Sequence, residues 1–363
     1  MAEIGLADIQ PFLYESLPAR VIFGPGCIDK LEQEVAALGA ERALILSTAE
    51  QSTDAERIAS QLGSRAAGVF NGAVMHVPAG VVTIGLSHAA RLSADLLIAI
   101  GGGSTIGLAK AMALETNLPI LAIPTTYAGS EMTPIYGITQ DGEKRTGKSR
   151  NVLPRTVIYD PELTVGLPVS ISVTSSLNAL AHAAEGLYAQ DTNPIHCLIA
   201  EEGIRAIADG LPGLIEAPHD IERRTNLLYG AWLCGTVLGH VGMALHHKLC
   251  HTLGGSFNLP HAETHTVLLP HALAYNADAA PQAMRRIERA LNSDNAPLGV
   301  HELALKNGAP ISLKQLGMQP QDLDRAAEIA CANPYWNPRP VERGALRELL
   351  QDAFDGAPPR QWN

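Results

Sequence analysis

The sequence lacks several features that would assign it to other classes of protein. Its 363 residues hold 26 Lys and Arg against 37 Asp and Glu, which gives a formal net charge of -11. Without a positive excess, the chain is not expected to bind nucleic acid or acidic lipid. No uncharged apolar run approaches the roughly 20 residues of a membrane span, and the opening MAEIGLADIQ lacks the positive charge of a signal peptide. We therefore expect a cytoplasmic protein, in which any anionic ligand is received by a local cluster of positive groups.

Cysteine is also scarce. The chain has five cysteines and no CxxC spacing, and an odd number of widely spaced cysteines favours reduced, mostly buried thiols. Cys250 lies among histidines and could be a soft metal ligand, but the histidines form a more plausible ligand set without it. The GxGxxG fingerprint of many dinucleotide-binding proteins is absent as well.

What the chain does contain is a change of pattern near residue 165. Before it, short apolar runs alternate with helical patterns; the predicted strands are 43–46, 67–70, 96–100 and 118–123, and the predicted helices are 55–62, 78–92 and 105–115. This alternation predicts a Rossmann-like α/β domain over residues 1–165, with a parallel sheet covered on both faces. Beyond it, helical periodicity predicts an all-helical domain over 166–363, with helices at 176–189, 194–211, 221–253 and 321–332. Ligands of such architectures usually lie in the cleft between the halves.

A glycine run lies between a predicted strand and a predicted helix. The run is Gly101, Gly102 and Gly103, followed by Ser104. Glycines let the backbone approach a ligand closely, and the unpaired N–H groups at the start of the next helix suit a pyrophosphate. The same four residues also occur in plain tight turns, so this signal is of moderate strength.

Two further segments are predicted to reach the same ligand. Thr125, Thr126 and Ser130 follow the next strand at its carboxyl end, where ligands of parallel sheets bind; Ser130 could alternatively be a helix cap. Thr48 follows the first predicted strand, where an acid would hold the ribose 2′-hydroxyl. Because a neutral Thr48 would not repel a 2′-phosphate, we expect NADPH to be accepted as well as NADH.

Histidines are concentrated in one segment: seven of the chain's 13 lie between His240 and His271. His247 and His251 are four residues apart on one predicted helix, as are Asn178 and His182 on another, so each pair shares a helix face. His261 follows Pro260 in a predicted loop. His182, His247 and His261 could converge on a divalent metal, whose site a carboxylate would complete. Asn178 offers only a neutral carbonyl oxygen, so we favour a site without metal.

A cationic pocket is the alternative use of these side chains. His246 and Lys248 flank the cluster, and together with His182, His247, His251 and His261 they could bind carboxylates. The imidazoles would not all be protonated at once, because like charges depress each other's pKa. His265 and His271 are expected to be structural or to lie at the rim.

The segments GGGST, IPTTYAGSEMT and DPEL, together with HxxxH followed by PH, resemble the iron-containing (group III) alcohol dehydrogenase family over nearly the whole chain. The resemblance implies a dehydroquinate-synthase-like fold, a homodimer, and a metal held by one Asp and three His. Those ligand positions fall on Asn178, His182, His247 and His261, and His251 would lie close to the nicotinamide. The family's cofactor-contacting lysine best matches Lys144, with Lys148 a weaker match.

Departures from the family pattern narrow the expectation. Where family alcohol dehydrogenases usually read HPLG and PHGxAN, this chain has HTLG from His251 and PHAETH ending at His265. With the missing acid at Asn178, this resembles a branch that uses NADH or NADPH to reduce the C=C bond of an unsaturated oxo-dicarboxylate in aromatic degradation, and that is described as needing no added metal. Without a metal, a protonated imidazole is the natural group to stabilise the enolate formed in that reduction, and we expect His251 or His247 to do so.

Three other functions stay open at this point. A metal-dependent alcohol or polyol dehydrogenase would require Asn178 to be tolerated as a ligand. A lyase or synthase of the dehydroquinate-synthase kind would use its nicotinamide only transiently. A non-enzymatic nucleotide- or anion-binding protein would bind NADH without turnover.

Overall fold

The computed structural model describes residues 12, 14–17, 19–140 and 143–362. The predicted absence of a signal peptide concerns residues outside this part. A six-stranded sheet forms the first half, with every neighbouring pair parallel and the strand order β1-β8-β5-β4-β2-β3. Its strands are β1 (Arg20–Phe23), β2 (Ala43–Leu46), β3 (Ala66–Phe70), β4 (Leu96–Gly101), β5 (Ile120–Pro124) and β8 (Thr156–Tyr159). The predicted α/β class is confirmed.

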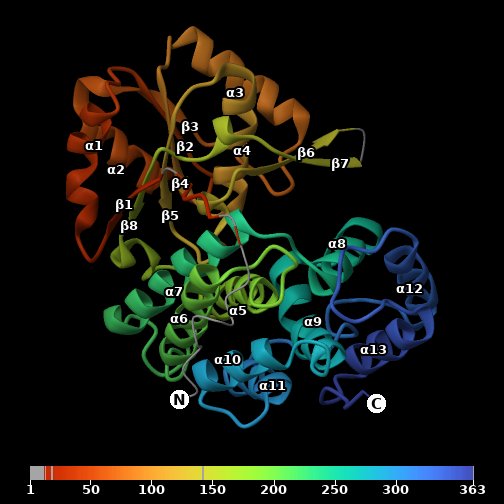
Figure 1. Ribbon diagram of the computed structural model, residues 1–363. Helices are drawn as coiled ribbons and strands as arrows, with labels where there is room; N and C mark the ends of the chain where they lie inside the picture. Colours follow the sequence, from red (N-terminus) through yellow and green to blue (C-terminus); the bar gives the residue numbers. More distant parts are fainter. Residues whose placement is uncertain (1–11, 13, 18, 141–142, 363) are drawn as a thin grey trace.

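Helices cover both faces of this sheet (Figure 1). One apolar core joins the sheet to α1 (Leu31–Ala37) and α2 (Ser52–Leu62), and the other joins it to α3 (Ala79–Arg91) and α4 (Gly103–Thr116). The central strands β2, β4 and β5 are buried along their whole length. That burial explains their continuous apolar runs, which are typical of parallel strands enclosed on both sides.

A two-stranded antiparallel hairpin projects from this half beside α4 (Figure 1). It consists of β6 (Ile135–Gln140) and β7 (Glu143–Lys148), and the sequence analysis did not predict it. The backbone N–H of Thr139 donates to the carbonyl of Val77 at 3.0 Å, which ties the hairpin to the loop before α3.

Helices make up the second half, as predicted. They are α5 (Val169–Gly186), α6 (Pro194–Gly210), α7 (Ile221–His240), α8 (Leu245–Phe257), α9 (His261–Asn276), α10 (Pro281–Leu291), α11 (Ala296–Lys306), α12 (Leu323–Ala332) and α13 (Arg343–Asp355). A continuous core links the two halves, because Tyr159 of β8 and Ala122 of β5 belong to the same apolar cluster as Leu177 of α5. The division near residue 165 stays a prediction as regards independent folding.

The single helix predicted over 221–253 is wrong. It is broken at residues 241–244, and α7 and α8 meet at 95°. Val241 is extended, with φ -116 and ψ 160, while the buried carboxylate of Glu185 accepts the N–H groups of Ala244 and His246 that open α8. The apolar pattern runs across this break, so periodicity alone did not reveal it.

Within the described residues, no single helix is both long and apolar enough to cross a membrane; α7 and α8 meet that criterion only as a bent pair.

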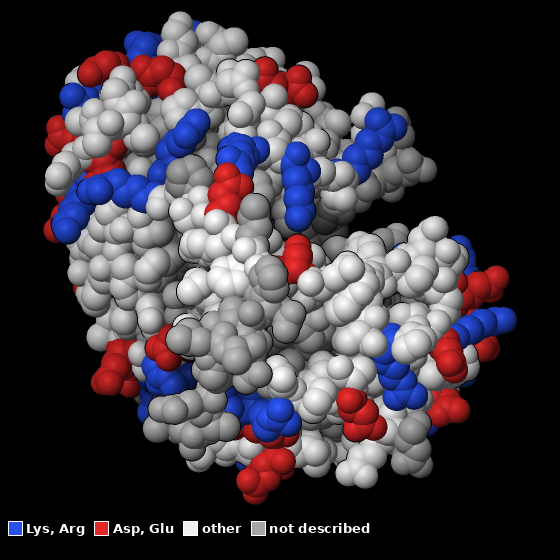
Figure 2. All heavy atoms as spheres, viewed as in Figure 1, with Lys and Arg blue, Asp and Glu red and all other residues white. Residues whose placement is uncertain are grey.

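The molecule is hollowed between its two halves (Figure 2). Figure 1 places the β6–β7 hairpin on one side of this cleft and α8 on the other. This cleft between the halves is where the sequence predicted ligands to lie.

Candidate active site: a glycine loop and a histidine cluster

The glycine loop connects β4 to α4 at the carboxyl edge of the sheet. Gly101 has φ +147, and an added Cβ would lie 2.5 Å from the Thr105 hydroxyl; a Cβ on Gly102 would lie 2.8 Å from Thr126. A Cβ on Gly103, the first residue of α4, would meet nothing within 4 Å. The backbone is therefore tightly packed at Gly101 and Gly102 and open at Gly103, which begins a 14-residue helix. This geometry fits the pyrophosphate of a dinucleotide.

The threonine loop lies against the glycine loop. β5 is the neighbour of β4, and the Thr125 N–H donates to the Gly101 carbonyl at 3.2 Å. The Thr125 hydroxyl accepts the Gln51 side-chain N–H at 2.7 Å. The structure thus brings the predicted Thr125 and Thr126 beside the glycine run, as the sequence analysis expected.

Ser130 is fixed by its backbone and does not cap a helix through its side chain. The ammonium of the fully buried Lys110 donates to the carbonyls of Ser130 at 2.6 Å, Thr133 at 2.8 Å and Ile135 at 2.9 Å. Burial lowers the pKa of Lys110 to about 7, while the nearby Glu131 raises it. Lys110 therefore fastens the loop after β5 to α4, which leads from the glycine run. The sequence analysis missed this residue.

The loop that follows β2 carries a carboxylate, Glu50, that was not considered in the sequence analysis. The pKa of the exposed Glu50 carboxyl is lowered by its own backbone N–H and by a hydrogen bond from the Thr48 side chain. Thr48 is neutral, as expected, but its side chain is hydrogen-bonded to the negatively charged Glu50 carboxylate. The Lys144 backbone pairs with Thr139 in the hairpin; its side chain lies outside the described part of the chain, so its cofactor role stays a prediction.

Three helices each present a pair of side chains separated by one turn. Asn178 and His182 lie on α5, His247 and His251 on α8, and His261 and His265 on α9. The ring centroids of His182 and His247 are 5.2 Å apart, those of His247 and His265 4.9 Å, and those of His261 and His265 4.4 Å. The predicted loop position of His261 is wrong: it is the first residue of α9, after the N-cap Pro260. The structure brings His182 and His247 together, as predicted, and His261 is connected to them through His265.

Glu185 holds α5 and α8 together within this cluster. It lies three residues after His182 and is fully buried. Its carboxylate accepts the N–H groups of Ala244 at 2.9 Å and His246 at 2.7 Å, and it accepts His247 Nδ1–H at 2.7 Å. This last bond fixes the His247 tautomer and leaves Nε2 directed into the cluster. Sequence reasoning missed Glu185, although the HxxE spacing from His182 places both on one face of α5.

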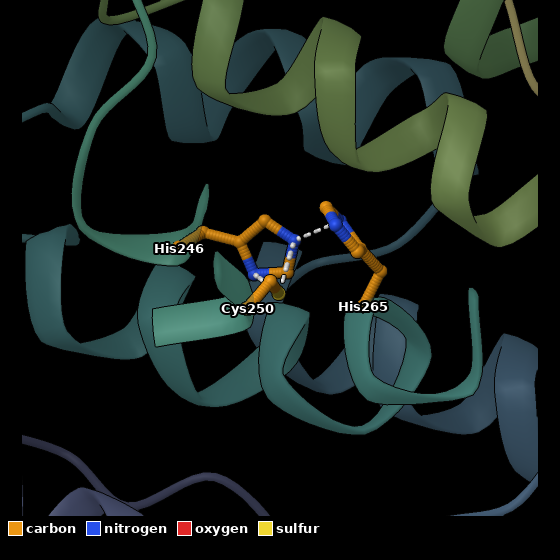
Figure 3. A group of neighbouring side chains, drawn as sticks. All are labelled: His246, Cys250 and His265. Atoms are coloured by element: carbon orange, nitrogen blue, oxygen red, sulfur yellow. Dashed lines mark hydrogen bonds between the residues drawn. The ribbon is translucent and has the colours of Figure 1, made fainter. Parts of the chain in front are cut away.

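Of the two positions expected for His265, structural or at the rim, the rim is excluded, because His265 lies inside the cluster. It is fully buried, and its Nδ1 is 2.9 Å from Nε2 of the equally buried His246 (Figure 3). Cys250 lies against His246, with Sγ 3.6 Å from Nε2. His271 is buried elsewhere, where Asp352 and His301 are its charged neighbours, which agrees with a structural role.

Burial disfavours charge on three histidines of the cluster. Burial lowers the pKa of His182 well below its usual value, and the imidazoles of His247, His261 and His251 lower it further. The pKa values of His246 and His265 are lowered for the same two reasons. The predicted cationic pocket is therefore corrected for His182 and His246, which favour the uncharged form at neutral pH.

Positive charge is available at the outer edge of the cluster. His251 and His261 are exposed, in contrast to the buried His182 and His247. The Lys248 ammonium lies 5.7 Å from the ring centroid of Tyr335, whose hydroxyl is 3.0 Å from His251 Nδ1. Tyr335 thus connects two residues that the sequence predicted to act at the site, although sequence reasoning missed it.

Comparison with known proteins identifies the family. Residues 18–161 match the model of the iron-containing alcohol dehydrogenases, and residues 172–354 match the C-terminal model of the same family. The chain belongs to the iron-containing alcohol dehydrogenase family. It is 61% identical to a maleylacetate reductase of Burkholderia cepacia over 96% of this chain and 99% of that protein.

Solved structures agree with this assignment. The maleylacetate reductases of Agrobacterium tumefaciens and of Rhizobium sp. strain MTP-10005 are each 54% identical, with a TM-score of 0.94 and coverage of 97% of this chain and 100% of theirs. Within the family the chain thus groups with the maleylacetate reductases. It is an oxidoreductase that uses a nicotinamide cofactor, and the glycine loop described above fits that cofactor's pyrophosphate.

The family's metal fits these residues poorly. Among the described residues, Asn178 Oδ1, His182 Nδ1 and His247 Nε2 are buried without hydrogen-bond partners, so atoms at three of the ligand positions are available to a bound group. However, the fourth position offers a neutral amide in place of a carboxylate, and Glu185 is committed to backbone N–H groups and His247. A set of neutral donors gives a divalent cation no charge compensation.

Proposed function

We propose that this chain reduces the C=C bond of maleylacetate to give 3-oxoadipate, with NADH or NADPH as the reductant and without a metal. The observation that carries the proposal is the cluster of imidazoles in which Asn178 stands where a metal would need an acid. Identity of 52–61% to eight maleylacetate reductases supports it.

The reaction requires stabilisation of negative charge on oxygen. Maleylacetate has two carboxylates and a ketone conjugated to its C=C bond, and the bound nicotinamide supplies a hydride. Addition of hydride to the alkene carbon β to the ketone moves an electron pair to the ketone oxygen, giving an enolate. One proton then goes to the carbon α to the ketone, and the ketone is restored. Hydrogen-bond donors placed at the developing oxyanion accelerate such a step.

Some residues of the cluster are suited to stabilising the enolate oxygen, and others are suited to binding the two carboxylates of the substrate. When His247 is protonated, its imidazolium is stabilised by Glu185 and presents Nε2–H to the cluster. His251, at the exposed edge and hydrogen-bonded to Tyr335, is the second candidate for stabilising the enolate or donating the proton. Lys248 and His261 are suited to the carboxylates because both lie toward the outer edge, and a local ammonium is needed against the net charge of -11.

A 2-chloro substituent would sit on the carbon that receives the hydride. Loss of chloride after addition would regenerate the C=C bond, and a second reduced nicotinamide would then reduce it. Substituted maleylacetates are therefore included in the proposed substrate range.

The functional test is turnover with product identification. NADH oxidation is followed with freshly prepared maleylacetate and, separately, with short alcohols and polyols plus NAD⁺. Maleylacetate-dependent oxidation yielding one equivalent of 3-oxoadipate is expected. Activity confined to alcohols would favour the metal-dependent dehydrogenase, and NADH binding without turnover would favour a binding protein.

Cofactor preference should respond to the charge at the end of β2. We expect both cofactors to be used. NADH should be preferred, because the Glu50 carboxylate is hydrogen-bonded to Thr48 and would repel the 2′-phosphate of NADPH. Glu50→Gln should raise kcat/KM for NADPH relative to NADH by about tenfold, because it removes a negative charge that repels the 2′-phosphate. Thr48→Asp should shift the ratio the other way. If neither variant changes the ratio, this region does not contact the ribose.

The remaining assignments concern the whole protein. We propose a cytoplasmic homodimer that binds a small dicarboxylate and neither nucleic acid nor membranes. Sedimentation equilibrium should give twice the 38.4 kDa of the chain; a mass equal to one chain would contradict the dimer.

A further inference from the structure

Four buried polar atoms of the histidine cluster have no hydrogen-bond partner among the described residues. They are Asn178 Oδ1, His182 Nδ1, His247 Nε2 and His265 Nε2. Each unpaired buried polar group costs about 1–3 kcal/mol, so several in one cluster indicate a place for a bound polar group. The first three belong to the family's metal positions. His265 is the additional member.

The proton of His265 can be placed from its contact with His246. Nδ1 of His265 lies 2.9 Å from Nε2 of His246. When His246 donates its Nε2–H across this contact, Nδ1 of His265 accepts it, and the His265 ring carries its own hydrogen on Nε2. The rings of His247 and His265 are 4.9 Å apart, at 74°, so the unpaired Nε2 atoms of both residues belong to the same cluster.

Asn178 supplies a neutral amide to this cluster, and His265 adds a buried imidazole to it. The cluster therefore lacks the anionic ligand that a metal would need, and it contains a further buried nitrogen without a partner.

We propose that His265 is a catalytic residue whose Nε2–H binds the ketone oxygen of the substrate as it becomes an enolate, and that His246 is the positioning residue that fixes its tautomer. This role rests on the proposed reduction of maleylacetate. His265 supplies the polarisation of the carbonyl, and the proton delivered to carbon comes from another group.

The test compares Gln and Asn at position 265, because their side-chain amides extend to different distances from the backbone. The Gln side-chain nitrogen extends about as far as imidazole Nε2, whereas the Asn nitrogen stops near Nδ1. With saturating NADH, His265→Leu and His265→Asn should lower kcat for maleylacetate about 10²–10³-fold, while His265→Gln should stay within about tenfold of wild type. His246→Leu should lower kcat with little change in KM. NADH affinity, measured by fluorescence, should be unchanged in all four.

The outcomes separate this role from the proposed function. A wild type inactive on maleylacetate would overturn both. An active wild type with His265→Asn or His265→Leu within twofold of its kcat would overturn only the His265 assignment. If His265→Leu does not fold, the contrast between Gln and Asn decides: equal activity of the two would contradict a donor at Nε2.

A structural rival is a soft metal site. His246, Cys250 and His265 offer ligand atoms that all lie within 4.8 Å of one another (Figure 3). The donor role predicts that Cys250→Ala keeps kcat within a few-fold and that one equivalent of Zn²⁺ does not raise activity. Loss of activity in Cys250→Ala, together with activation of wild type by Zn²⁺, would overturn the donor role in favour of a His₂Cys ion site.

Discussion

Glu185→Gln is expected to lower kcat for maleylacetate by roughly 10²–10³-fold, because outer groups that orient a functional histidine strongly affect activity. The carboxylate accepts His247 Nδ1–H at 2.7 Å and two N–H groups at the start of α8. Glutamine has one acceptor oxygen and introduces N–H donors facing these donors. His247 would then lose the anion that stabilises its imidazolium, and α8 would lose part of its connection to α5.

The same change should also destabilise the fold by about 1–3 kcal/mol, since at least one buried N–H group is left unpaired. Glu201→Gln is the matched control: Glu201 also accepts from more than one donor, Arg286 and Arg289, but it lies outside the cluster. It should leave kcat unchanged. Stopped-flow single turnovers measure the effect on the chemical step, and an unaltered rate in Glu185→Gln would remove His247 from the mechanism.

Asn178→Asp is expected to create a metal site. The substitution changes one atom and one charge among His182, His247 and His261. A unit charge pair at 4 Å contributes about 4 kcal/mol at an effective dielectric constant of 20, so affinity for Zn²⁺ or Fe²⁺ should rise by about 10³-fold or more. The purified variant should retain close to one equivalent of metal, and its maleylacetate activity should become sensitive to chelation.

Asn151→Asp is the control, since it adds the same charge at an exposed position. Metal content by mass spectrometry and binding by calorimetry provide the measurement. If wild type already binds metal as tightly as Asn178→Asp, the amide does not weaken the site, and the alcohol-dehydrogenase alternative gains support.

The sequence predicted the sheet because its central strands are buried on both faces, so runs such as 43–46 and 96–100 are apolar throughout. It did not predict β1, β8 or the β6–β7 hairpin. β7 of the hairpin is rich in charged and polar residues and has no apolar signature, whereas the RVIF of β1 and the TVIY of β8 are short apolar runs that were overlooked. The break between α7 and α8 was missed because the carboxylate that accepts the N–H groups at the start of α8, that of Glu185, lies about 60 residues away in the sequence.

The residues of the site were likewise predictable only where the sequence pattern is local. Helical spacing correctly paired Asn178 with His182 and His247 with His251, because that spacing is local. The place of His265 and the pairing of His246 with it depend on how α8 and α9 pack, so spacing could not reveal them. The neutrality of the interior was underestimated for a similar reason: it comes from burial, which spacing does not measure.

Chelation tests the central claim most directly. The wild-type protein is treated with EDTA, its metal content is verified, and NADH oxidation with fresh maleylacetate is measured before and after addition of Fe²⁺ or Zn²⁺. Undiminished turnover in the metal-depleted protein, with no gain on adding either ion, is the result expected when imidazoles and Glu185 act in place of an ion. Loss of activity on chelation and recovery with metal would contradict the account and show that Asn178 serves as a ligand.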